Sequence, residues 1–74
     1  MADTFRTVLE WLDYLGWSRR DLARQAGIDP HTVGRAADGD TISPQSAQRI
    51  ARAISEASGS TVRVGDIRGM IISR

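Results

Sequence analysis

Residues 17–39, WSRRDLARQAGIDPHTVGRAADG, predict two short helices joined by one tight turn. Ser18 is a favourable N-cap residue, and Asp21 follows it at the spacing of a capping box, in which each side chain bonds the other residue's backbone N–H. Gly27 is expected to end this helix, because glycine readily adopts the left-handed conformation found at helix ends. The caps therefore place the first of the two helices between Ser18 and Gly27.

The second helix is predicted by the same kind of signal. Asp29 is its expected N-cap, and Pro30 suits the first helical position, where no backbone N–H is needed. Ile28 before the cap and Val33 at the fourth helical position form a hydrophobic staple. Two helices this short and this close must cross at a steep angle, and Ala23 is small where their backbones approach. The spacing is that of a helix-turn-helix.

This motif resembles the helix-turn-helix of the phage-repressor-like family, the Xre and Cro/repressor type. The agreement is specific for a short motif, because cap, turn and core positions agree together. Asp38 and Gly39 stand where the family usually has Asn-Gly. The matching residues are Ser18, Leu22, Ala23, Ala26, Gly27, Ile28, Thr32, Val33, Arg35, Asp38 and Gly39. The resemblance implies an all-α fold: a compact four- to five-helix bundle with a short C-terminal tail, forming one DNA-binding domain over residues 1–74.

A second family offers a partial match. Residues 21–54 also resemble the headpiece of the lac-repressor-like family, which begins directly with the first helix of the motif. The additional helix predicted ahead of the motif therefore favours the phage-repressor-like type, and no ligand-binding domain is expected to follow.

The additional helix is predicted from Thr4 to Leu15, capped by Asp3 or Thr4 and ended by Gly16. Trp11 and Tyr14 fall beside its apolar stripe, so we expect them to cover the edge of the core. The stripe itself, at helical spacing, consists of Phe5, Val8, Leu9, Leu12 and Leu15.

A fourth helix is predicted from Pro44 to about Ser58, with Gly59 as its end. Its apolar stripe is Ala47, Ile50, Ala51 and Ile54, which leaves Arg49 and Arg52 exposed.

The tail over residues 60–74 is expected to contain a short strand over 61–64 and a single helical turn over 65–68 that returns Ile67 to the core. Met70, Ile71 and Ile72 have no evident place in that core. We interpret them as a dimer contact, with packing of the chain end as an equally weighted alternative.

Composition argues against several classes of function. The chain has no cysteine, one histidine and no glycine-rich phosphate loop, so no catalytic residue, metal or cofactor is expected. The first residues, MADTF, are unlike a signal peptide, and the longest apolar run is far shorter than a membrane span. We expect a cytoplasmic protein with no membrane and no small-molecule partner.

Charge is unevenly distributed along the chain. Residues 18–35 and 44–74 contain more arginine than acid, whereas residues 1–17 and 36–43 are acidic. A solvated surface of mixed charge would explain this as simply as a binding face.

The motif supplies the candidate DNA contacts. In a bound helix-turn-helix the second helix lies in the major groove with its N-terminal residues facing the base edges. The expected base contacts are Asp29, Pro30, His31, Thr32, Gly34 and Arg35. Arg35 is the strongest of them, because a guanidinium bonds guanine through two donors. The expected phosphate contacts are Ser18, Arg19, Arg20, Thr41, Ser43 and Gln45.

Three departures from the family pattern weaken the expected affinity. Gly34 is small where the family more often has a larger residue, and Pro30 replaces a long polar side chain. Asp38 and Asp40 place negative charge where relatives often carry Lys or Arg. Neutralisation of phosphates supplies much of the affinity for DNA, so we expect dimerisation to compensate.

Two hypotheses follow. The first is a dimeric, sequence-specific transcription regulator, a repressor of a phage or mobile element, that binds double-stranded DNA. The second is a protein-interaction or antitoxin-like subunit with the same fold, suggested by the acidic loop and the apolar tail.

Overall fold

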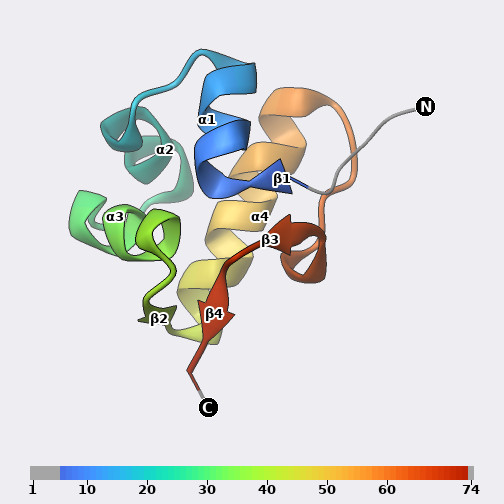
Figure 1. Ribbon diagram of the computed structural model, residues 1–74. Helices are drawn as coiled ribbons and strands as arrows, with labels where there is room; N and C mark the ends of the chain where they lie inside the picture. The colour runs from blue at the N-terminus through green and yellow to red at the C-terminus, as the bar shows by residue number, and fades with distance from the viewer. Residues whose placement is uncertain (1–5, 74) are drawn as a thin grey trace.

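Residues 6–73 fold into four helices and two pairs of very short strands (Figure 1). The computed structural model describes residues 6–73. In chain order the elements are β1 (Arg6–Thr7), α1 (Val8–Leu15), α2 (Arg19–Ala26), α3 (Pro30–Asp38), β2 (Thr41–Ile42), α4 (Pro44–Ser58), a 3₁₀ turn (Val64–Asp66), β3 (Ile67–Arg68) and β4 (Ile71–Ile72). The domain is compact and mostly helical, as predicted, but the all-α prediction is wrong in missing the strands.

The boundaries of α2 and α3 agree with the cap prediction. The Ser18 hydroxyl accepts from the Asp21 N–H at 3.1 Å, and the Asp21 carboxylate accepts from the Ser18 N–H at 2.9 Å. The Asp29 carboxylate accepts from the His31 N–H at 2.8 Å and so caps α3. Gly27 has a φ of 70°, the left-handed conformation that ends α2. These caps satisfy helix-end N–H groups that would otherwise lack partners.

The prediction for the first helix is wrong at its start. Residues 3–5 lie outside the described part of the chain, but Arg6 and Thr7 are extended and pair in parallel with Ile67 and Arg68. The N-cap is Thr7, whose hydroxyl accepts from the Glu10 N–H at 3.1 Å in a second capping box. Pairing with the C-terminal tail holds the backbone extended just before the helix, and Thr7 supplies the cap at that point.

The buried face of α1 also differs from the prediction. Trp11 is 1% exposed and belongs to the core rather than to its edge, whereas Leu9 is 48% exposed. The helix buries Val8, Trp11 and Leu12, a spacing that turns the large indole inward. Tyr14 remains exposed and meets the Trp11 ring edge-on, with centroids 5.7 Å apart.

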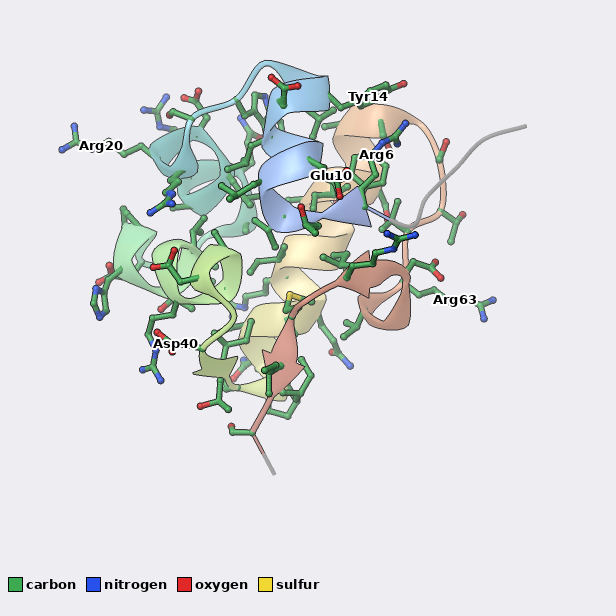
Figure 2. The ribbon with its side chains drawn as sticks, in the orientation of Figure 1. Arg6, Glu10, Tyr14, Arg20, Asp40 and Arg63 are labelled. Carbon is green, nitrogen blue, oxygen red and sulfur yellow. The ribbon has the colours of Figure 1, made fainter. Side chains whose placement is uncertain are left out.

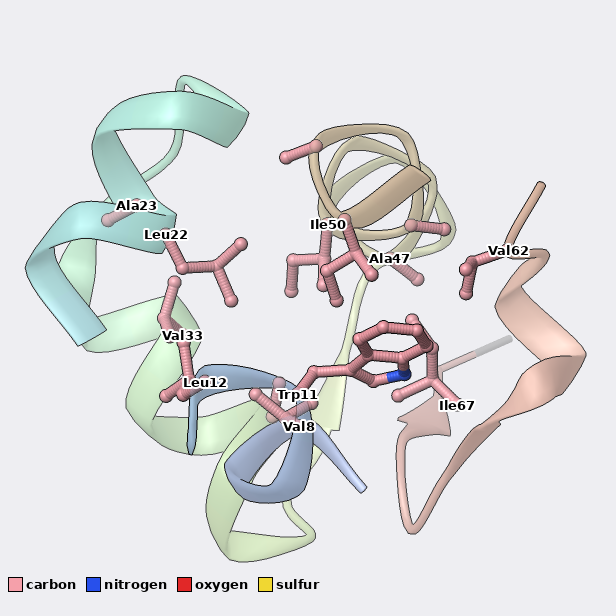
Figure 3. Close-up of a cluster of buried hydrophobic side chains, with 14 of the residues drawn as sticks. Val8, Trp11, Leu12, Leu22, Ala23, Val33, Ala47, Ile50, Val62 and Ile67 are labelled. Atoms are coloured by element: carbon pink, nitrogen blue, oxygen red, sulfur yellow. The ribbon is translucent and has the colours of Figure 1, made fainter. Parts of the chain in front are cut away.

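Helix α4 forms the centre of the core, and its prediction is confirmed from Pro44 to Ser58. Its buried residues are Ala47, Ile50, Ala51, Ala53 and Ile54, which include the whole predicted stripe. In Figure 3 the Trp11 ring projects from α1 toward Ile50 of α4 and Ile67 of the tail. Ile67 is buried, as expected.

The predicted strand over 61–64 is wrong. Val62 is buried, but its N–H bonds the Ser55 hydroxyl of α4 at 2.8 Å instead of a neighbouring strand. Val64 already begins the 3₁₀ turn, so the expected turn over 65–68 starts and ends earlier. The strands form further along, where β3 pairs with β1 and β4 pairs with β2.

Pairing of β4 with β2 packs part of the apolar run over residues 70–72 against the core. Met70 and Ile72 are partly buried against the core, contrary to the expectation that they had no place there, and Ile71 is 49% exposed. The Ser73 N–H extends the pairing by bonding the Ile42 carbonyl oxygen at 2.8 Å. Of the three residues, Ile71 is therefore the one that offers the most surface to a partner.

Candidate nucleic-acid interface

Helix α3 lies at the surface with one face buried and the other exposed. Val33 and Ala36 are buried, whereas His31 and Arg35 point outward. Helix α2 packs against both α3 and α4. Arg49 of α4 also donates to the Gly27 carbonyl oxygen at 3.2 Å. This bond joins the turn between α2 and α3 to the central helix.

Two shallow hollows flank this exposed face. The first is about 400 Å³ and is lined by Arg19, Pro30, His31, Gly34, Arg35, Asp38 and Asp40. The second is about 390 Å³ and is lined by Thr32, Arg35, Thr41, Ile42, Ser43, Ser46 and Ser73. Arg35 lines both, so its guanidinium stands between a charged hollow and one rich in hydroxyl groups.

The hollows bring together most of the predicted DNA contacts. Every expected base contact except Asp29 lines one of the two. Among the expected phosphate contacts, Arg19 lines the first hollow, and Thr41 and Ser43 line the second. Residues of α2, of β2 and of the N-cap of α4 therefore lie beside the exposed face of α3.

The remaining predicted contacts lie elsewhere or are already engaged. Asp29 and Ser18 use their side chains as helix caps. Arg20 extends from α2 into solvent on the same side of the view as Asp40, and opposite Arg63 (Figure 2). Gln45 is exposed in the first turn of α4 but lines neither hollow.

The first hollow carries both positive and negative charge. The Arg19 guanidinium lies 3.7 Å from the Asp38 carboxylate, and Asp40 lines the same hollow. At the start of α2, the Ser18 backbone N–H holds the pKa of Asp21 below its ordinary value by bonding the carboxylate form, and the Ser18 hydroxyl contributes to the same shift. Asp21 is therefore charged near neutral pH and is held at the cap, outside the hollows.

Sequence reasoning missed several residues of this region. Arg49 was expected only to be exposed, and its bond to the turn depends on a helix far along the chain. Asp38 was expected to place negative charge where relatives often carry Lys or Arg, and its pairing with Arg19 was not predicted. Ser46 and Ser73 line the second hollow, and only the β2–β4 pairing brings Ser73 there.

Within residues 6–73 no cluster of three acidic, histidine or cysteine side chains is arranged to hold a metal ion. None of the helices described is both long enough and apolar enough to cross a membrane. Comparison of the chain with protein-family models, with curated proteins and with solved structures found no match in any of the three.

Proposed function

We propose that this protein is a sequence-specific, DNA-binding transcription regulator that places α3 in the major groove. The observation that carries the proposal is the exposed face of α3, where Arg35 stands between two hollows lined by further candidate contacts. A guanidinium in that position suits bidentate recognition of guanine, while hydroxyl groups and a second arginine beside it suit phosphate oxygens. Repression, rather than activation, follows only from the family resemblance.

The length of α3 supports binding as a homodimer. Nine helical residues extend over about 13 Å, which corresponds to about four base pairs. A sequence of about four base pairs recurs often in any long DNA, so a single copy of the protein would have little specificity. Two copies related by a two-fold axis would read a palindrome with half-sites about one helical turn apart, or a multiple of it. Ile71 is the exposed apolar residue of the tail, and in this proposal it contributes to the dimer contact.

The test begins with selection of binding sites from a random pool of duplex DNA, together with the region upstream of the gene. Fluorescence anisotropy then compares the selected duplex with a scrambled one over a series of salt concentrations. We expect preference for the selected duplex by about a thousandfold, and affinity for both that falls steeply as salt rises.

Two arginine variants test the placement of α3. Arg35→Ala should weaken binding to the selected duplex by about 5- to 150-fold, because it removes a base contact. Arg63→Ala is the matched control, since it removes the same charge from an exposed side chain on the opposite side of the view in Figure 2. Equal effects of the two variants would overturn the placement of α3 in the groove.

Feeble and equal binding to both duplexes would instead support the second hypothesis, a protein-interaction or antitoxin-like subunit. In that case the protein should co-purify with a stoichiometric partner, such as a toxin encoded beside it. The partly buried positions of Met70 and Ile72 remove much of the apolar surface that suggested this hypothesis.

A further inference from the structure

Arg19 and Asp38 form an ion pair that joins the start of α2 to the end of α3. The Arg19 Nη2 atom lies 3.7 Å from the Asp38 Oδ1 atom, and the two side chains are 49% and 61% exposed. This separation is longer than that of a charge-assisted hydrogen bond, and both groups remain in contact with water. Such a pair is worth at most about fivefold in an equilibrium constant, so another anion can replace Asp38.

The Arg19–Asp38 pair spans Gly34 on the surface of α3. A Cβ atom built on Gly34 would lie 3.6 Å from Arg19 Nη1, which places the guanidinium directly over this glycine. Gly34 and Asp38 are one helical turn apart, so they share the face of α3 that lines the first hollow. The guanidinium is therefore held on the same surface that the proposed function turns toward DNA.

The position of Arg19 in α2 favours an anion beside it. Arg19 and Arg20 occupy the first two positions of the helix, where the helix dipole disfavours positive charge. Asp21 in the same turn is committed to the Ser18 cap. Of the acidic residues described, Asp38 is the one paired with Arg19 in the free protein.

We infer that Asp38 occupies in the free protein the position on Arg19 that a DNA phosphate takes in the complex. Asp38 is thus a positioning residue that sets DNA affinity through Arg19 and reads no base. This inference rests on the proposed function, because it assumes that the face of α3 docks on DNA. Binding of DNA must then break the Arg19–Asp38 pair, and the released carboxylate faces the phosphate backbone.

Asp38→Asn tests the inference. It should strengthen binding to the selected and to the scrambled duplex by the same factor, about two- to fivefold, because phosphate contacts carry no sequence information. The dependence of log affinity on log salt should steepen by up to about 0.9. When Arg19 pairs with a phosphate, a cation is released from the DNA, and in the variant no freed Asp38 carboxylate takes up a cation in exchange.

The control is Glu56→Gln on α4. Arg52 and Glu56 also form an exposed ion pair, at 3.1 Å, so this variant removes the same charge and frees one arginine away from both hollows that flank α3. It should change DNA affinity by less than about twofold. Measured in an Arg19→Gln background, Asp38→Asn should also lose most of its effect, because the partner through which it acts is gone.

The possible results separate the two proposals. If the wild-type protein binds DNA but Asp38→Asn matches Glu56→Gln, or acts equally with and without Arg19, the inference is overturned and the proposed function stands. Weaker binding of Asp38→Asn to the selected duplex alone would also overturn it, since Asp38 would then read a base. If neither the wild type nor any variant binds DNA at low salt, both proposals are overturned.

Discussion

Replacing Gly34 with alanine is expected to stabilise this protein, although Gly34 lies under the guanidinium of Arg19. Gly34 is inside α3 and is not one of the glycines with positive φ. An added Cβ would meet Arg19 Nη1 at 3.6 Å, which is ordinary van der Waals contact. Neither backbone strain nor a steric clash therefore opposes the substitution.

The magnitude follows from helix propensity. Glycine in a helix interior is less favourable than alanine by about 0.8–1.0 kcal/mol, in large part because the unfolded glycine chain has more conformations to lose. We expect Gly34→Ala to raise the free energy of unfolding by about 1 kcal/mol. For a domain of 74 residues this corresponds to an increase in Tm of about 4–8 °C.

Gly16→Ala is the matched comparison. A Cβ at Gly16 would meet nothing within 4 Å, but the φ of this residue is 70°. The left-handed conformation costs an ordinary residue about 1–2 kcal/mol, so this variant should be destabilised. The two glycines thus differ in backbone conformation far more than in available space, and alanine should move stability in opposite directions.

Urea unfolding followed by circular dichroism at one protein concentration measures both variants, and the m-value should stay constant. A lower midpoint for Gly34→Ala would refute the reasoning, because it would mean that Arg19 cannot adjust to an added methyl group. An unchanged midpoint for Gly16→Ala would equally refute the argument from backbone conformation.

Three further predictions concern the core, acid stability and assembly. Leu22→Ala removes a fully buried side chain and should lower the free energy of unfolding by about 2–5 kcal/mol, measured in the same urea experiment; a loss below about 1 kcal/mol would contradict its burial. The pKa values of Glu10 and Asp21 are lowered, chiefly because the backbone N–H group of the N-cap residue bonds each carboxylate. The stability that these two carboxylates contribute is therefore complete above their unfolded pKa values of 4.5 and 3.8, and it is lost as the pH falls through the lower pKa values of the folded protein. Thermal melts from about pH 6 to about pH 3 should show this loss, and a variant carrying Glu10→Gln and Asp21→Asn should show a flatter profile. Ile71→Asp should convert the proposed dimer to monomer in sedimentation velocity, whereas Leu9→Asp, at an equally exposed apolar position, should not; equal behaviour of the two would argue against the tail as the contact.

The ends of three helices were predictable from the sequence because caps are local. Ser18, Asp29 and Ser43 each precede the helix that they cap, and the N–H groups that their side chains accept from lie two or three residues away. The glycines that end these helices have φ values between 70° and 83°, which few other residues adopt. Both signals operate within one turn of the chain, so no knowledge of the tertiary structure was needed.

The first helix shows where local signals were insufficient. Asp3 or Thr4 was the cap expected from the sequence, whereas the structure uses Thr7, where β1 pairs with β3. Likewise, Leu9 was expected in the apolar stripe and Trp11 beside it, whereas packing against α4 and the tail buries the Trp11 ring and leaves Leu9 exposed. These choices depend on the other end of the chain, which periodicity does not describe.

The candidate site also has one part that the sequence shows and another that only the tertiary structure decides. Its composition was evident from the sequence, because the motif identified α3 and Arg35 as its outward-facing arginine. Its geometry was decided by the fold: Arg49 reaches the turn from α4, and Arg19 pairs with Asp38 across a glycine. Caps and turns are set by residues that are neighbours in the chain, whereas pairs between elements are set by the packing that brings distant residues together.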